Sequence, residues 1–268
     1  MVNLGDPIDP SIVKSVKNEA RLMKLVNSEN VIKVYEFQPK VTFWVKDKTP
    51  RNVSYISLKL AENGDLIEIM EQYGILGERI AKYYFWKLID TLELMHSKGI
   101  CHLDIKPENI LFDEDYNLKL CDFGYSLNSI MVGSKKGTSG YAAPEIYEKE
   151  IYSGPMTDVF SAGVVLFIMV VGHPPFSLPF KSDIRYKYFH KNNLTKFWDL
   201  TWNNKGQVTK QFSDDFKELI NAILVPDPQT RLCLSEIKMH SWWKNDVPTL
   251  EEVQDYFNDF SSSDEDSQ

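Results

Sequence analysis

One segment constrains this sequence more than any other. Residues 102–109 read His-Leu-Asp-Ile-Lys-Pro-Glu-Asn, so Asp104 and Asn109 stand five positions apart. Two short motifs follow in order, Asp122-Phe123-Gly124 and Ala143-Pro144-Glu145. Asp-Phe-Gly alone is most often an ordinary turn, so no single motif is decisive. Three motifs in this order and at this spacing rarely coincide by chance, and they predict a shared catalytic core.

The three motifs resemble the catalytic core of protein kinases, whose set is H-R-D-x-x-x-x-N, D-F-G and A-P-E. The resemblance runs from about Ser11 to Trp243. It implies an α+β, bilobal kinase-like fold with a truncated small strand-bearing lobe and a complete, mainly helical large lobe. The expected parts are a partial small lobe at 1–60, the large catalytic lobe at 61–243, a C-terminal helix at 244–260 and a disordered acidic tail at 261–268.

Composition and charge limit the partners and the compartment expected for this protein. The chain has 268 residues, of which 43% are hydrophobic, enough for a sizeable core. A net charge of -8 argues against a nucleic-acid partner, since such domains are usually basic. The three cysteines form no CxxC pair and leave one unpaired in any scheme, which favours a reducing intracellular compartment. We therefore expect a cytoplasmic protein, and the nucleus is an alternative location.

The sequence gives no sign of a membrane partner. Residues 1–10 lack the basic-then-apolar pattern of a signal segment. The longest apolar stretch, Val159 to Val171, is too short to span a bilayer and predicts a helix buried in a core.

Hydrophobic periodicity predicts a helix from Ser11 to Val26 and a long helix from Glu78 to Ser97, stopped by Lys98-Gly99. Strands are predicted at Val31–Phe37, Val41–Val45 and Val53–Leu60. A charged turn at Lys46–Asn52 separates the second from the third, and Asn63-Gly64-Asp65 ends the third. From Asp158 onward we expect helices only.

The resemblance implies that the chain transfers the γ-phosphate of Mg-ATP to serine or threonine of protein substrates, with ATP and Mg²⁺ as cofactors. Asp104 would accept the proton of the substrate hydroxyl. Asn109 and Asp122 would hold Mg²⁺ on the nucleotide phosphates. Lys106 would steady the transferred phosphate, and Thr138 would bridge Asp104 and Lys106. The alternative for each residue is a place in an ordinary surface loop.

Further residues are expected to hold the scaffold. Glu145 and Arg231 match the family's buried ion pair behind the substrate loop. Asp158 matches the acid that begins the central helix and holds the catalytic loop. His102 and Phe123 resemble the stacked apolar spine of active kinases, so we expect packing from them and not chemistry.

The nucleotide pocket is placed by aligning Asn63-Gly64-Asp65-Leu66 with the family's turn, a register that could slip by one. Leu58 then takes the gatekeeper position, and Lys59, Leu60 and Ala61 form the hinge. Backbone groups of Lys59 and Ala61 would bind adenine, Asp65 would reach the ribose and Leu111 would lie under the adenine ring.

Two departures from the family pattern affect activity. The glycine-rich loop and the V-A-I-K lysine should precede Glu19, which has the spacing of the family's helix glutamate, yet Gly5 is the one glycine before Gly64. We expect the first three strands of the small lobe to be absent. The chain is then either an incomplete kinase sequence, which we favour, or a short pseudokinase that acts as a scaffold. Leu103 also replaces the arginine that reads an activation-loop phosphate, so a phosphate on Ser134 should matter little.

Three segments resemble the calcium/calmodulin-dependent kinase-like group of Ser/Thr kinases: Gly140–Glu145, Gly172–Phe176 and Asp227–Arg231. Asp65 and Glu108 match positions where basophilic kinases place acids that face substrate arginines. The alternative is that both acids are merely solvated.

The C-terminal segment begins with a capping pattern, Thr249 followed three residues later by Glu252. One apolar face follows, formed by Leu250, Val253, Phe257 and Phe260. Calmodulin targets are usually basic amphipathic helices, whereas this segment is acidic. We therefore predict a helix packed on the large lobe, with no calmodulin binding.

Overall fold

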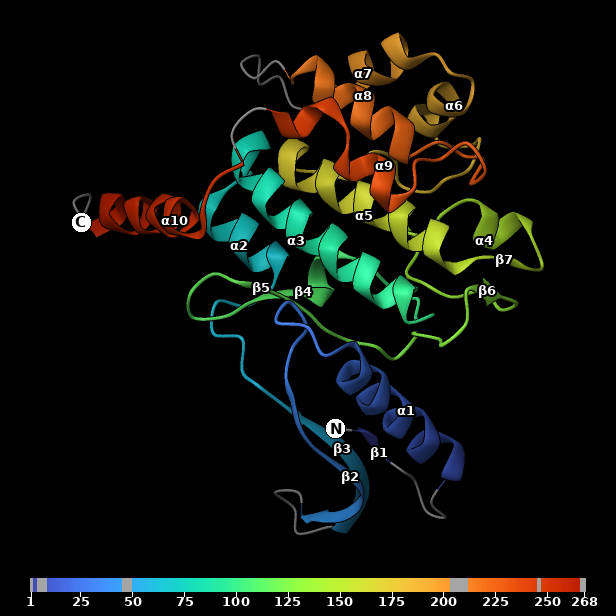
Figure 1. Cartoon of the computed structure of the whole chain (residues 1–268), viewed down its shortest axis with the longest axis vertical. Helices are drawn as coiled ribbons and strands as arrows, with labels where there is room; N and C mark the ends of the chain where they lie inside the picture. The colour runs from blue at the N-terminus through green and yellow to red at the C-terminus, as the bar shows by residue number, and fades with distance from the viewer. Residues whose placement is uncertain (1, 4–8, 45–49, 203–211, 245–246, 266–268) are drawn as a thin grey trace.

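The computed structural model describes residues 2–3, 9–44, 50–202, 212–244 and 247–265, with side chains described from 9 to 259 inside these ranges. A small lobe of one sheet and one helix lies against a larger, mainly helical lobe (Figure 1). The α+β, bilobal fold is therefore the one expected.

The small lobe contains β1 (Val2–Asn3), α1 (Pro10–Val26), β2 (Val34–Trp44) and β3 (Pro50–Leu58), with the strands in the order β1-β3-β2. Asp9 caps α1 by accepting from the Ser11 amide at 2.8 Å, and Asn27 ends it in a left-handed conformation with φ 48°. The family's first three strands were expected to be absent. Among the described residues one strand of two residues, β1, precedes α1, and it pairs antiparallel with β3. Neither of its two residues is a lysine.

The two strands expected before the charged turn are one strand, β2. Its register against β3 shifts between Gln38 and Val41, which leaves Pro39 and Lys40 in a bulge. Proline cannot donate to a ladder, and a bulge tolerates it without ending the strand. β3 begins at Pro50, inside the expected turn, and residues 45–49 of that turn lie outside the described residues.

The large lobe is built around α5 (Gly154–Val171), which packs against α3 (Gly77–Ser97) and α8 (Asp214–Ile223). α5 is long and apolar enough to cross a membrane by length and composition, but 83% of it is buried in the lobe. A Cβ on Gly163 would lie 2.3 Å from Cγ2 of Ile223, so glycine allows α5 and α8 to approach this closely.

Shorter elements complete this lobe: α2 (Leu66–Tyr73), η1 (Pro107–Asn109), β4 (Ile110–Phe112), β5 (Leu118–Leu120), β6 (Met131–Val132), α4 (Glu145–Glu148), β7 (Tyr152–Ser153), α6 (Ile184–His190), α7 (Leu194–Trp202), α9 (Leu234–Lys238), η2 (Ser241–Lys244) and α10 (Leu250–Glu265). From Asp158 onward, the described elements are helices, as expected. The pairing of β6 with β7 and the helix α2 were not predicted, although Asp65 and Glu68 form a capping box that signals α2.

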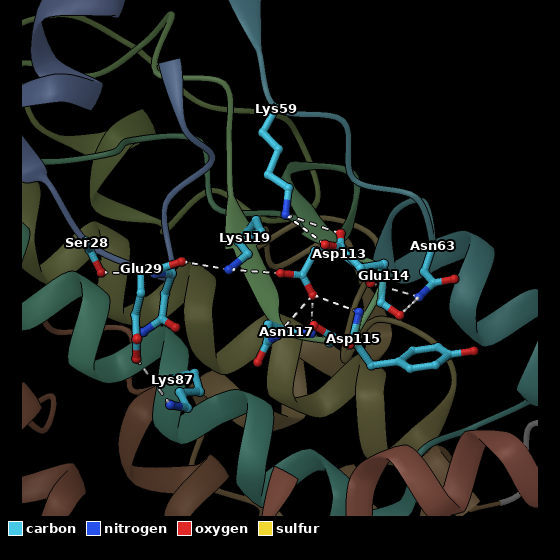
Figure 2. A network of polar contacts seen from close by, with 12 residues as sticks. Ser28, Glu29, Lys59, Asn63, Lys87, Asp113, Glu114, Asp115, Asn117 and Lys119 are labelled. Carbon is cyan, nitrogen blue, oxygen red and sulfur yellow. Dashed lines mark hydrogen bonds and ion pairs between the residues drawn. The ribbon is translucent and has the colours of Figure 1, made fainter. Parts of the chain in front are cut away.

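The turn between β4 and β5 connects distant parts of the chain (Figure 2). Asp113 Oδ1 accepts from the amides of Asp115 and Asn117 at 3.2 and 2.9 Å, and Oδ2 lies 3.1 Å from Lys119 Nζ. On the hinge side, Asn63 donates to the Asp113 carbonyl at 2.8 Å. The turn is therefore fixed both internally and to the segment that joins the lobes.

The C-terminal helix α10 packs on the other side of this turn. Phe257 is fully buried and stacks on Tyr116 with ring centroids 4.3 Å apart. Gln254 donates to the Asp115 carbonyl at 3.1 Å. Thr249 caps the helix by accepting from the Glu252 amide at 3.3 Å, as the capping pattern predicted.

α10 differs from the prediction at its far end, because it continues to Glu265 and not to residue 260. Residues 261–265 contain no glycine or proline to stop a helix. The disorder expected for 261–268 is thus wrong for 261–265, and residues 266–268 lie outside the described residues.

Candidate active site

The loop at residues 102–109 is held by Asp158 in the first turns of α5. The Asp158 carboxylate accepts from the His102 amide at 2.9 Å and from the Leu103 amide at 2.7 Å. Leu103 has φ 66°, a left-handed conformation that costs a non-glycine residue on the order of 1–3 kcal/mol. The two hydrogen bonds to Asp158 offset that strain and fix the start of the loop.

His96 also belongs to this support, and the sequence analysis missed it. Its Nε2 lies 2.9 Å from Oδ2 of Asp158. A histidine six residues before His102, in the last turn of a predicted helix, is a weak signal without the fold.

Asp104 is 4% exposed, and its carboxylate meets two other predicted catalytic side chains. The Thr138 hydroxyl donates to Oδ1 at 2.6 Å, and Lys106 Nζ lies 2.9 Å from Oδ2. Lys106 also donates to the Thr138 hydroxyl at 3.0 Å, which closes a triangle. Burial alone would lower the pKa of Lys106, but Asp104 outweighs it and raises that pKa. Lys106 therefore remains protonated beside the carboxylate.

Asn109 and Asp122 provide the oxygen atoms expected for a metal. Asn109 Nδ2 donates to the Asp104 carbonyl at 2.8 Å and to Oδ2 at 3.2 Å, which leaves the amide oxygen for another partner. Asp122 is exposed, has φ 57° and accepts from the Gly124 amide at 3.1 Å. Mg²⁺ prefers carboxylate and similar hard oxygen ligands, so this donor set fits it.

His102 joins the catalytic loop to the Asp-Phe-Gly segment. Asp104 donates its amide to Nδ1 of His102 at 3.3 Å, so Nε2 carries the proton and donates to the Cys121 carbonyl at 3.0 Å. Burial lowers the pKa of His102, which keeps the ring neutral. Phe123 packs edge-on against the ring with centroids 4.9 Å apart. This arrangement has the packing geometry expected for both residues.

Glu145 and Arg231 form a buried, bidentate ion pair. The two guanidinium nitrogens lie 2.7 and 3.0 Å from the two carboxylate oxygens, and both side chains are almost fully buried. Arg231 also donates to the carbonyls of Met156 and Val225 and lies over the Phe160 ring at 4.9 Å. All three guanidinium nitrogens of Arg231 thus donate hydrogen bonds within the protein.

The predicted hinge follows β3. The Lys59 amide donates to the Lys33 carbonyl at 2.9 Å, so of its backbone groups the carbonyl is the one left for adenine. Its ammonium group pairs with Glu114 at 3.1 Å (Figure 2). Leu58 is 38% exposed, and Ala61 is half-buried. The Lys59 side chain, for which the sequence analysis gave no role, thus connects the hinge to the β4–β5 turn.

Asp65 and Leu111 lie beside one another, joined by an isolated antiparallel bridge. Asp65 uses Oδ1 to cap α2, accepting from the amides of Ile67 and Glu68 at 2.8 and 3.0 Å. The capping hydrogen bonds of Asp65 thus use one of its two carboxylate oxygens. Glu108 is exposed in η1, where its charge raises the pKa of Tyr141 after the larger effect of burial.

Glu19 faces the Asp-Phe-Gly segment. A Cβ on Gly124 would lie 3.0 Å from Asp122 Oδ1 and 4.0 Å from Glu19 Oε2. Burial, and then the charge of Asp122, raise the pKa of Glu19. Among the described residues, no lysine forms an ion pair with Glu19. The family's lysine–glutamate pair is therefore not formed in the described part of the chain.

The segment after Gly124 is held by contacts with the residues that precede α5. β6 pairs with β7, and the Tyr152 hydroxyl donates to the Ser134 carbonyl at 2.6 Å. Leu103, at the position of the phosphate-reading arginine, is 5% exposed and apolar. Ser134 itself is exposed, as expected for a loop serine.

Known protein kinases are similar to this chain over most of its length. The protein kinase domain profile matches residues 6–243. Serine/threonine-protein kinase SIK2 of Gallus gallus is 33% identical over 251 residues, which is 92% of this chain and 28% of that protein. CBL-interacting protein kinase 11 of Oryza sativa subsp. japonica is 32% identical over 256 residues, 92% of this chain and 46% of that protein. The chain thus spans less than half the length of these relatives. It belongs to the protein kinase family, among the Ser/Thr kinases of the calcium/calmodulin-dependent kinase-like group.

Proposed function

We propose that this chain carries the phosphoryl-transfer centre of a protein serine/threonine kinase that uses Mg-ATP. The observation that supports this most directly is the triangle of Asp104, Lys106 and Thr138 beside Asn109 and the exposed Asp122. A scaffold has no chemical need for a buried carboxylate oriented by a lysine and a hydroxyl next to two metal-type oxygen donors.

The proposed reaction forms a bond between the substrate hydroxyl oxygen and the γ-phosphorus of ATP. The bond from that phosphorus to the bridging oxygen breaks, and ADP leaves with the electron pair. Asp104 accepts the hydroxyl proton, and Lys106 stabilises the negative charge on the transferred group. Asn109 and Asp122 would hold Mg²⁺, which neutralises phosphate charge when bound.

We further propose that the substrates are basic around the target residue. Glu108 is exposed two positions from Lys106, and Asp65 has one carboxylate oxygen beyond those that cap α2. Paired acids near the catalytic loop favour arginine or lysine on a bound peptide through charge complementarity. Because the chain's three cysteines are all free, we place this activity in a reducing intracellular compartment.

A second candidate is a scaffold that binds protein partners without phosphoryl transfer. The observation that favours it is Glu19, which faces Asp122 with no lysine partner among the described residues. Loss of one preorganised charge donor lowers a rate by on the order of 10²–10³. We therefore expect slow transfer from this chain as it stands.

The test compares transfer from labelled Mg-ATP to a serine peptide flanked by arginines and to the same peptide with glutamates. Asp104→Ala should lower the rate by on the order of 10²–10⁴, the usual contribution of a general base. The matched pair is Thr138→Ala, which should slow transfer, and Ser139→Ala, an exposed neighbour that should not.

Transfer that survives Asp104→Ala would contradict the proposed centre, and a preference for the acidic peptide would contradict the basic specificity. If the chain shows no transfer, thermal stabilisation by Mg-ATP distinguishes the two candidates. Stabilisation lost in Asp122→Ala would support a nucleotide site that is catalytically weak. An absence of stabilisation in the unmodified chain would favour the scaffold.

A further inference from the structure

The outer face of α1 carries a stripe of positive charge on a chain whose net charge is -8. The stripe consists of Lys14, Lys17, Arg21 and Lys24, all exposed. Their spacings of three and four residues place them on one helix face. Glu19, the one acid in α1, lies on the opposite face toward Asp122. The basic stripe therefore faces solvent while the acid faces the catalytic centre.

Within the part of the chain that the structure describes, few of these charges are neutralised. No carboxylate of a described residue forms an ion pair with Lys14, Lys17 or Lys24. Arg21 donates to the side-chain oxygen of Asn18 at 3.0 Å, which is a neutral partner.

A cavity of about 580 Å³ opens at the C-terminal end of this stripe. Its apolar lining comes from Met23, Val31, Ile32 and Val34, and its polar lining includes Lys24 and Lys33. Lys59 and Lys119 also line it, but Figure 2 shows them paired with Glu114 and Asp113. Glu29 lines it as well and pairs with Lys87 at 3.6 Å, and Lys33 lies over the Tyr35 ring at 5.5 Å. The cavity thus combines an apolar interior with a mainly basic rim.

We propose that the basic stripe and this cavity form a docking site for an acidic protein segment with one apolar side chain. The acidic residues would lie along Lys14, Lys17, Arg21 and Lys24, and the apolar side chain would enter the cavity. The stripe runs over eleven residues of helix, about 15 Å from first to last, which an extended peptide covers in about five residues. The site is separate from the proposed phosphoryl transfer and does not require it.

The cavity favours a peptide over the other polyanions. Nucleic acid presents phosphates to basic surfaces and has no apolar side chain to fill a recess among Met23, Ile32 and Val34. A membrane surface is flat on this scale and attracts basic residues without needing a cavity. A peptide can satisfy both parts of the site at once.

Binding is tested by fluorescence anisotropy with a labelled peptide of about eight residues, glutamates and aspartates with one leucine at the end. The double substitution Lys17→Glu and Arg21→Glu should weaken binding by about tenfold or more, and added salt should weaken binding to the unmodified protein. The matched control is Lys191→Glu with Lys196→Glu, the same charge change on exposed residues of the large lobe. Because all four residues are exposed, circular dichroism and melting temperature should be unchanged.

Val34→Phe tests the cavity separately. It should weaken the leucine peptide by at least several-fold and leave a serine-substituted peptide unaffected. Equal losses from the stripe and control reversals would show non-specific attraction and overturn the proposal. Tighter binding of duplex DNA or of phosphatidylserine vesicles, with the same dependence on Lys17 and Arg21, would overturn it in favour of that partner.

Discussion

Truncation of Phe257 to alanine tests whether α10 is part of the folded large lobe. The side chain is 0% exposed, stacks on Tyr116 at 4.3 Å and meets the Tyr73 ring edge-on at 4.8 Å. Burial of a phenylalanine removes on the order of 200 Å² from water, and its loss to alanine in a core costs about 3–5 kcal/mol. A change of this size should lower the melting temperature of a chain this long by on the order of 10 °C.

The measurement is thermal and urea unfolding followed by tryptophan fluorescence. Asn258→Ala is the matched control, since Asn258 is exposed on the same helix and should change stability by less than about 0.5 kcal/mol. A chain that ends at Pro248 lacks α10, so its loss of stability is the upper limit for Phe257→Ala. Once α10 has undocked, a substitution within it cannot lower the stability further. Equal melting temperatures for Phe257→Ala and Asn258→Ala would refute the docked position of α10.

Three further predictions follow from buried groups. Removal of either partner of the Glu145–Arg231 pair should cost about 3–5 kcal/mol in urea unfolding, because it leaves an uncompensated buried charge; an effect below about 1 kcal/mol would show that the pair is solvated. Burial would raise the pKa of Asp113, but hydrogen bonds from its turn and its lysine partner outweigh this and lower it. Asp113→Asn should thus lower the free energy of unfolding by a constant amount above about pH 4, and by less as the pH falls further. A loss of stability that grows in acid would contradict the lowered pKa of Asp113. Burial raises the pKa of the Cys121 thiol to about 12, so maleimide should label it far more slowly than the more accessible Cys233, as mass spectrometry of the labelled peptides can show.

The arrangement of the loop at residues 102–109 was predictable because its polar residues are close in sequence. Asp104, Lys106 and Asn109 fall within six residues, and their motif carries roles that the resemblance could assign directly. Thr138 and Arg231 are distant in sequence, yet they stand in motifs of their own, and the structure brings both to the expected neighbours. Helix ends were readable where a capping residue marks them, as at Thr249.

Contacts between segments that lack a motif were not predictable. In the sequence, Lys59 is an ordinary hinge residue. Only the fold places its Nζ 3.1 Å from Oε1 of Glu114. Two strands were predicted on either side of Pro39, where the structure has one strand with a bulge. The preference of a single residue cannot distinguish such a bulge from the end of a strand. The basic stripe of α1 was also invisible in a composition that is acidic as a whole, since net charge says nothing about its distribution.

The β4–β5 turn has a thermodynamic consequence for the two ends of this lobe. One short segment accepts Asn63 from the hinge side and Gln254 and Phe257 from α10. When two events both depend on the order of one element, each changes the equilibrium of the other by the same factor. A ligand whose binding orders this turn would favour the docked α10, and a partner that undocks α10 would weaken that ligand by the same factor. Through this turn, a partner that binds the C-terminal helix would change the affinity of a ligand at the hinge, although it contacts neither Lys59 nor Ala61.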